Sequence, residues 1–123
     1  MSRRTERAEW SGGRDPSDPH IRAELIYKAR PLNGIWAVAP YLHNGSVPTL
    51  DALLSPEDSA RPSEFWMGSK QYDPVKVGYD GSEIPGATLF DTTMPGNSNQ
   101  GHLYGTNLSS EDKLDLLEYL KGF

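Results

Sequence analysis

The sequence contains no cysteine. This absence excludes a disulfide, a thiolate metal site and a haem attached to this chain by thioether bonds. No apolar run is long enough to span a bilayer, and a net charge of −5 gives none of the basic excess that nucleic-acid binding requires. We therefore predict neither a membrane span nor a nucleic-acid partner. Because the chain contains no cysteine, the sequence does not indicate an oxidising or a reducing compartment.

Apolar residues are also scarce, at 36% of the 123 residues, whereas 12 glycines and 10 prolines interrupt the chain. A chain of this length forms one domain with a modest core, and frequent glycine and proline favour loops. Residues 1–20 are polar and charged and lack the apolar stretch of a signal peptide, so we predict them to be disordered. The folded domain is expected to cover 21–123.

Three helices are predicted from capping residues and apolar spacing. The first is a short helix over 21–28. The second lies in "NGSVPTLDALLSP", where Pro48 suits the first helical position and Pro56 ends the helix. The third lies in "LSSEDKLDLLEYLKGF", where Ser109 and Asp112 have capping-box spacing. Its apolar stripe consists of Leu114, Leu117 and Leu120, widened by Leu116.

No periodicity persists between residues 55 and 95, where prolines and glycines recur. Only short strands near "KVGY" and "ATLFDT" are expected there. The predicted fold class is therefore mainly α, loop-rich, with little or no sheet.

Histidine supplies the candidate site residues. His20 lies in the polar N-terminal segment and is interpreted as an exposed loop residue. His43 lies in "APYLHNGS", where the chain should leave an apolar run at a turn; the alternative is a buried histidine bonded to backbone. His102 lies in the glycine-flanked polar loop "MPGNSNQGHLYG", whose backbone permits close approach of a ligand. The alternative is that His102 is an ordinary exposed residue. Met94, in the same loop, is a second soft ligand or a packing residue.

Other chemistries have weaker support. The sequence contains no His-Glu-x-x-His, no G-x-S-x-G and no Walker phosphate loop. A calcium site is a further reading, but the carboxylates lack the spacing of an EF-hand loop. These carboxylates are Asp73, Asp80, Glu83 and Asp91.

Most of the chain also resembles a known family. The segment "YKARPLNGIWAVAPYLHNGSVPTLDALL" (27–54) resembles the C-terminal cytochrome c domain of bacterial dihaem c-type cytochromes, which include cytochrome c peroxidases and haem-containing rubber oxygenases. The segments "RPSEFWMGSKQYDPVKVGY" and "FDTTMPGNSNQGHLYGTNLSSEDKLDLLEYLKGF" are more similar to the rubber-oxygenase branch. The resemblance covers about 21–123. It implies haem c as cofactor, electron transfer in a peroxidase-like oxidoreductase, and a periplasmic or secreted location.

The chain departs from this pattern because it lacks C-x-x-C-H, which attaches the haem and supplies its proximal ligand. We interpret it as a fragment of a cytochrome c-like domain whose missing N-terminal part, or a redox partner, completes it. The charged start without an apolar leader favours an internal methionine or a truncated reading frame. The alternative is a degenerate, non-haem interaction module that kept the scaffold. In either case the isolated chain is expected to lack peroxidase and oxygenase activity.

The resemblance also implies roles for the candidate residues. His102 would be the distal axial ligand of the haem iron, with Met94 as the alternative. His43 would lie at the haem edge and form a hydrogen bond near the porphyrin. The stripe of Leu114, Leu117 and Leu120 would pack on the haem-attachment helix of an intact protein and lie exposed here.

Overall fold

The computed structural model describes residues 29–56 and 61–123. The chain divides into two units, 1–30 and 31–123, and the helices and strands of the described residues lie in the second. The predicted disorder of 1–20, His20 and the predicted helix over 21–28 lie outside the described residues. The domain limits of 21–123 therefore stay a prediction.

The described residues form two α-helices, each with a side-chain cap at its N-terminus, and one 3-10 turn without such a cap. The 3-10 turn η1 spans Ile35–Ala37, α2 spans Leu50–Leu53 and α3 spans Ser110–Leu120. The Ser109 hydroxyl accepts a hydrogen bond from the Asp112 backbone N–H at 3.1 Å, which confirms the predicted cap of α3. At α2 the Thr49 hydroxyl accepts from the Ala52 N–H, so Thr49 is the cap and Pro48 precedes the helix instead of opening it.

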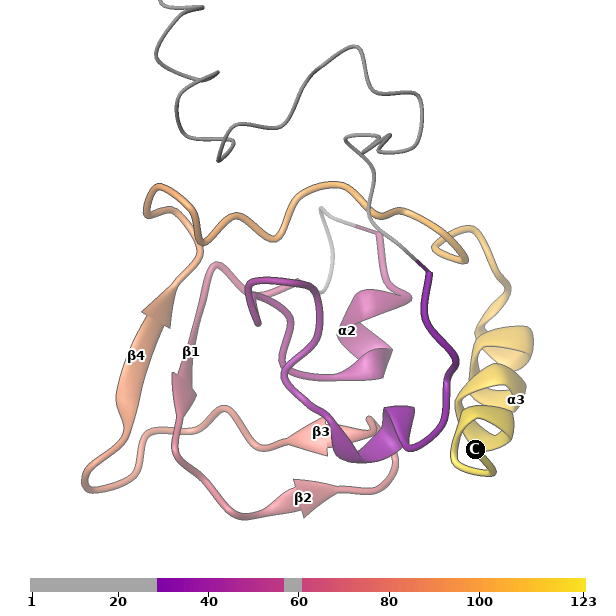
Figure 1. Cartoon of the computed structure of the whole chain (residues 1–123), viewed down its shortest axis with the longest axis horizontal. Coiled ribbons are helices and arrows are strands. Elements are labelled where there is room, and N and C mark those ends of the chain that lie inside the picture. Colours follow the sequence, from indigo (N-terminus) through magenta and orange to yellow (C-terminus); the bar gives the residue numbers. More distant parts are fainter. Residues whose placement is uncertain (1–28, 57–60) are drawn as a thin grey trace, which may run out of the picture. The chain divides into compact units, whose positions relative to one another are not determined.

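Four short strands form two antiparallel pairs (Figure 1). Strand β1 (Glu64–Met67) pairs with β4 (Thr88–Asp91), and Phe65 lies opposite Phe90. Strand β2 (Tyr72–Asp73) pairs with β3 (Gly78–Tyr79). The strands β3 and β4 occur where "KVGY" and "ATLFDT" predicted them.

The predicted fold class is wrong, because the described chain is not mainly α. Helix α2 has 4 residues and α3 has 11, beside two small sheets. Strands β1 and β2 were missed because each is short and gains its hydrogen bonds from a partner distant in sequence or across a turn. Aromatic pairs across the strands support the pairing: the rings of Phe65 and Phe90 stack at 5.2 Å.

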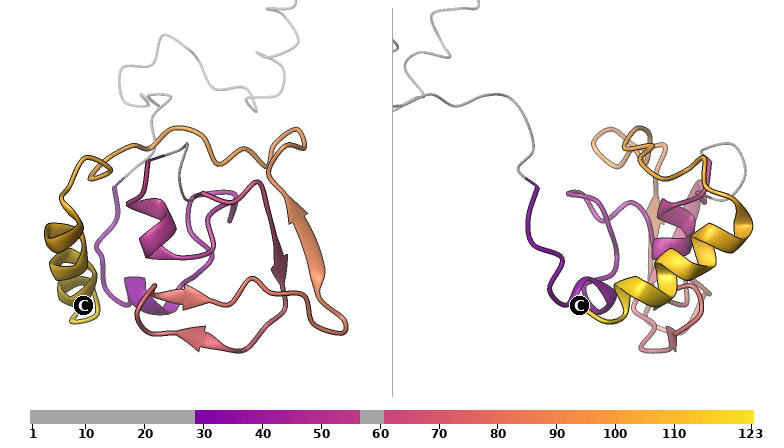
Figure 2. Two further views of the ribbon diagram at one scale, coloured as in Figure 1. Left: turned by 180° about the vertical axis from the view of Figure 1, so that it is seen from behind. Right: turned by 90° about the vertical axis from the view of Figure 1, so that its right-hand side faces the viewer.

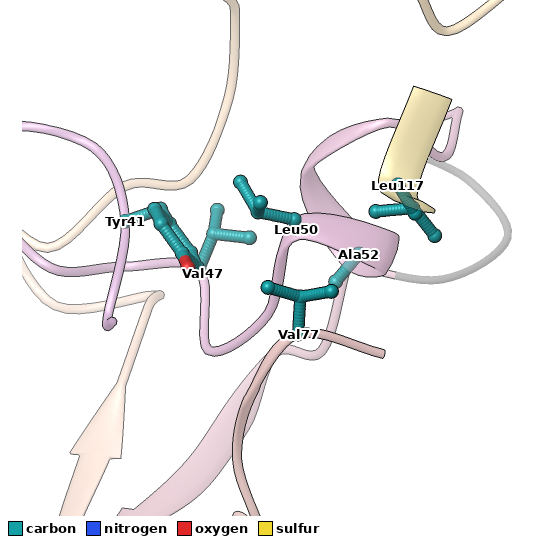
Figure 3. Packing of buried hydrophobic residues seen from close by; sticks show 6 residues of the cluster. All are labelled: Tyr41, Val47, Leu50, Ala52, Val77 and Leu117. Carbon is teal, nitrogen blue, oxygen red and sulfur yellow. The ribbon is translucent and has the colours of Figure 1, made fainter. Parts of the chain in front are cut away.

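The core lies between α2, α3 and the β2–β3 turn (Figure 3). Backbone bonds from Leu50 N–H to the Val77 carbonyl and from Asp51 N–H to the Lys76 carbonyl, both 3.0 Å, join the start of α2 to this turn. A Cβ at Gly78 would lie 2.4 Å from the Pro48 carbonyl oxygen, so only glycine permits this approach. The buried cluster comprises Tyr41, Val47, Leu50, Ala52, Val77 and Leu117.

The apolar stripe of α3 is divided between core and surface. Leu117 is 1% exposed and Leu120 packs against the core, whereas Leu114 is 54% exposed. The expectation that the whole stripe lies bare is therefore wrong, because the chain's own core covers most of it.

Candidate functional site

Two loops distant in sequence bring the candidate histidines together. The first loop, 41–47, follows η1, and the second, 94–108, leads from β4 towards α3 and contains no helix or strand (Figures 1 and 2). The rings of His43 and His102 lie 6.2 Å apart between centroids, at an interplanar angle of 61°. Both residues are exposed. The structure therefore forms one exposed two-imidazole site from residues that the sequence presents only separately.

Loop 41–47 is a tight turn closed by a backbone bridge. Tyr41 donates to the Val47 carbonyl at 2.7 Å, Val47 donates back at 3.3 Å, and both side chains are buried. Leu42 adopts a φ of 67° and Gly45 a φ of 69°, so the chain reverses within a few residues. His43 lies at the exposed tip, as predicted for a turn that leaves buried chain, and the buried alternative is wrong.

Asn44 ties this tip to the second loop. Its Nδ2 donates to the carbonyls of Gly96 and Ser98 at 3.1 and 2.8 Å. Its Oδ1 accepts from the Ser46 backbone N–H at 3.2 Å. The two Nδ2 bonds thus join the loops beside His43, and the Oδ1 bond stabilises the turn of the first loop.

Arg61 anchors the chain around His102. Its Nη1 donates to the carbonyls of Asn99 and Gly101, each at 2.6 Å, and its Nη2 donates to the carbonyls of Leu53 and His102, each at 3.1 Å. The residue is only 7% exposed. A buried guanidinium is costly to desolvate, and several carbonyl dipoles offset that cost. Arg61 therefore links α2 directly to the histidine-bearing loop.

His102 itself has an unusual backbone, with a φ of 52°. A non-glycine residue in the left-handed region is strained, and such strain persists only where the surroundings impose it. Here Arg61 holds the carbonyls of both Gly101 and His102. The imidazole is consequently presented from a backbone that is fixed on both sides of the Cα atom.

Met94 lies in the turn after β4 and is 55% exposed. Its carbonyl accepts from the Asn97 N–H at 3.0 Å, and Gly96 within this turn is bonded to Asn44. The loop 94–108 also exposes other large apolar side chains, namely Leu103, Tyr104 and Leu108.

Three of the four carboxylates considered for calcium are engaged in their own turns, and Glu83 is the exception. Asp73 Oδ1 accepts the N–H groups of Val75 and Lys76, Asp80 Oδ1 accepts from Ser82, and Asp91 Oδ1 accepts from Thr93. Within 29–56 and 61–123, no three histidine, aspartate or glutamate residues are arranged to hold a metal ion. The calcium reading therefore finds no support, because short-range turn formation already explains these residues.

The donor chemistry of the two loops fits a haem in part. Imidazole and thioether are both axial ligands of haem iron, and the exposed apolar side chains of loop 94–108 offer one wall for a porphyrin. Two cavities, of about 330 and 270 Å³, are lined by neither histidine, so neither is a haem pocket built around them. The imidazoles of His43 and His102, whose ring centroids lie 6.2 Å apart, therefore have the donor chemistry that haem iron requires, and the chain contains no cysteine to attach the group.

Sequence reasoning missed Asn44 and Arg61. The Asn-Gly pair at 44–45 does signal a turn, but nothing in "ARPSE" marks Arg61 as an anchor. Its partners are backbone carbonyls, which any sequence provides.

Residues 26–67 match the model of the family described as RoxA-like, cytochrome c-like. The matched segment contains His43, Asn44 and Arg61 and ends before Met94 and His102. This finding supports the resemblance at the level of a cytochrome c-like domain, which suggests haem binding and electron transfer. No helix within the described ranges is long and apolar enough to cross a bilayer.

Two proteins of Sinorhizobium fredii are similar to the chain over most of its length. The uncharacterized protein y4iJ is 53% identical over 110 residues, which cover 82% of this chain and 18% of y4iJ. The uncharacterized protein y4iM is 40% identical over 119 residues, covering 77% of this chain and 27% of y4iM. The chain therefore spans less than a third of the length of these curated relatives.

Proposed function

We propose that this chain forms the C-terminal, haem-facing portion of a dihaem c-type cytochrome with peroxidase-like oxidoreductase activity. The observation that carries the proposal is the juxtaposition of His43 and His102 at an exposed site, on two loops held by Asn44 and Arg61. The match of 26–67 to a cytochrome c-like family supports it. An extracytoplasmic location and a redox partner belong to the same proposal.

His102 would hold the haem iron at one axial position, with Met94 as the alternative donor. Its strained backbone is fixed by Arg61, and rigid support is what a ligand needs. Leu103 and Tyr104 directly follow His102 and are exposed, so they are available to cover an apolar ring. When bound, haem iron supplies one-electron redox chemistry.

His43 would act at the haem edge. Its ring centroid lies 6.2 Å from that of His102, so a second imidazole would be close to the ligand without itself binding iron. In this position it would orient the ligand or bind a polar group of the porphyrin. Covalent attachment and the proximal ligand would come from sequence outside this chain, since the chain contains no cysteine.

The second candidate function is a non-haem interaction module. The lack of cysteine favours it, as do the exposed apolar side chains on the same loop as His102. In that case the loops would be a contact surface and the histidines ordinary surface residues.

The test is a titration of the purified chain with ferric haem, followed by absorption spectroscopy. We expect His102→Ala to weaken haem binding by about tenfold or more and to remove the low-spin spectrum, because a coordinate bond is lost. His43→Ala should have a smaller effect and Met94→Ala the least. Asn107→Ala, an exposed loop residue, is the matched control.

Each alternative outcome has a clear meaning. Loss of the low-spin spectrum in His43→Ala, with His102→Ala unchanged, would reverse the two assignments. A dominant effect of Met94→Ala would make the thioether the ligand. If none of the three substitutions changes binding, the interaction module replaces the haem proposal.

A further inference from the structure

A cavity of about 330 Å³ lies apart from the histidine-bearing loops. Its walls come from the start of α2, from β1, and from the β2–β3 hairpin with the turn after it, and none of its lining residues belongs to 41–47 or 94–108. These elements are tied to one another by backbone bonds, including Trp66 N–H to the Gly81 carbonyl at 2.9 Å. Its volume is in the range of small-molecule sites, and its walls are preformed.

Aromatic and other apolar groups form part of the cavity surface. Phe65 is 6% exposed and its ring is stacked on that of Phe90. The Tyr79 ring packs edge to face against the Tyr72 ring, with 5.7 Å between the ring centroids. Both aromatic walls are therefore held in place by a neighbour. A Cβ at Gly81 would lie 3.1 Å from the Phe65 Cβ, so the glycine keeps this side of the cavity open.

The charged lining is strongly unbalanced. Four carboxylates line the cavity with a single ammonium group, that of Lys76. One carboxylate, Asp51, is paired with Lys113 at 2.9 Å. The backbone N–H of Lys76 holds the pKa of Asp73 below its usual value, so this group is ionised at neutral pH. The four carboxylates are Asp51, Glu64, Asp73 and Asp80.

The spacing of these carboxylates argues for an organic cation over a metal ion. The four carboxylates line different parts of the cavity wall. Among the described residues, no three carboxylate or histidine side chains lie close enough together to hold a metal ion. Aromatic faces attract organic cations, and carboxylates form charge-assisted hydrogen bonds with ammonium groups. An ammonium compound with an apolar stem matches both parts of the lining.

We propose that this cavity is a binding site for a small aliphatic amine. The apolar stem would lie against Phe65 and Tyr79, and the ammonium groups would face the carboxylates. Glu64 would be the main partner, because among the described residues the other three carboxylates form turn hydrogen bonds or an ion pair and Glu64 does not. This site is independent of haem binding, since it shares no residue with the histidine-bearing loops.

The experiment is isothermal titration calorimetry of the full chain with cadaverine, with 1,5-pentanediol as the uncharged counterpart. We expect saturable 1:1 binding of cadaverine, weakened by salt, and none of the diol. Glu64→Gln should weaken cadaverine binding by about tenfold, the effect of one charge-assisted hydrogen bond. Glu83→Gln removes an exposed carboxylate outside the cavity and should change the affinity by less than about twofold.

Three results would overturn the proposal. They are an absence of saturable cadaverine binding, equal binding of the diol, and equal weakening by Glu64→Gln and Glu83→Gln, which would indicate diffuse attraction to an acidic chain. Circular dichroism of each variant checks that its fold is retained. Tyr79→Ala provides a second route to the same test, because it removes an aromatic wall and leaves every carboxylate in place.

Discussion

The region around α2 and the loop 94–108 are held in place by different forces. Around α2, apolar side chains are fully enclosed; Val47 and Val77 are both 0% exposed. In 94–108, large side chains are exposed and the backbone is held by amide and guanidinium donors from Asn44 and Arg61. Apolar burial thus supplies the scaffold, while a few charged or amide hydrogen bonds set the geometry of the candidate haem site.

The largest effect is expected in the apolar region. Leu117→Ala should lower the free energy of unfolding by about 3 kcal/mol, because it removes buried methyl groups and leaves a cavity. Leu114→Ala, on the same helix but 54% exposed, should cost less than about 0.5 kcal/mol. Urea unfolding measures both. Equal losses would show that Leu114 is also covered in solution, contrary to its exposure here.

The loop region should be more sensitive to its polar anchors. Arg61→Ala should lower the free energy of unfolding by about 2 kcal/mol, because four backbone carbonyls lose a charged donor. It should also speed hydrogen exchange in 94–108, which is the more specific readout. Arg61→Lys retains the charge without the planar guanidinium group, and it should lower the free energy of unfolding by about half as much.

A contrary result for Arg61 is easily recognised. If Arg61→Ala unfolds more easily but exchange in 94–108 is unchanged relative to the other loops, the guanidinium serves the core and does not hold the histidine-bearing loop.

The smallest effect concerns the pH dependence of the apolar region. Burial, and then the charges of Tyr72 and Tyr79, raise the pKa of Tyr41 above its usual value. The neutral phenol is therefore favoured in the folded state, and its contribution is complete below the unfolded pKa of about 10 and lost as the pH rises further. Stability measured by urea unfolding from pH 7 to 11 should fall above about pH 10.

Tyr41→Phe separates the two contributions of this side chain. It should cost about 1 kcal/mol at pH 7, because the Tyr41 hydroxyl donates to the Ile35 carbonyl at 2.9 Å. It should also reduce the loss of unfolding free energy above pH 10. Part of that loss should remain, because the pKa of Tyr72 is raised as well. Tyr104→Phe, at a residue 85% exposed, should change neither. An unchanged slope in Tyr41→Phe would contradict the assignment.

Local patterns in the sequence predicted what local interactions decide. The cap at Ser109, helix α3 and the short helix after Thr49 depend on hydrogen bonds within a few residues, and the turn that exposes His43 follows from the Asn-Gly pair at 44–45. The lack of cysteine, and with it the exclusion of covalent haem attachment within this chain, also follows from the sequence alone.

Only the tertiary structure decided the remaining features. The pairing of β1 with β4, the burial of Leu117 but not Leu114, and the meeting of His43 with His102 all require segments distant in sequence to come together. Such contacts depend on the mutual fit of many side chains, which no local period encodes. Arg61 shows the reason most directly. Its partners are backbone carbonyls whose positions exist only once α2 and loop 94–108 are in place.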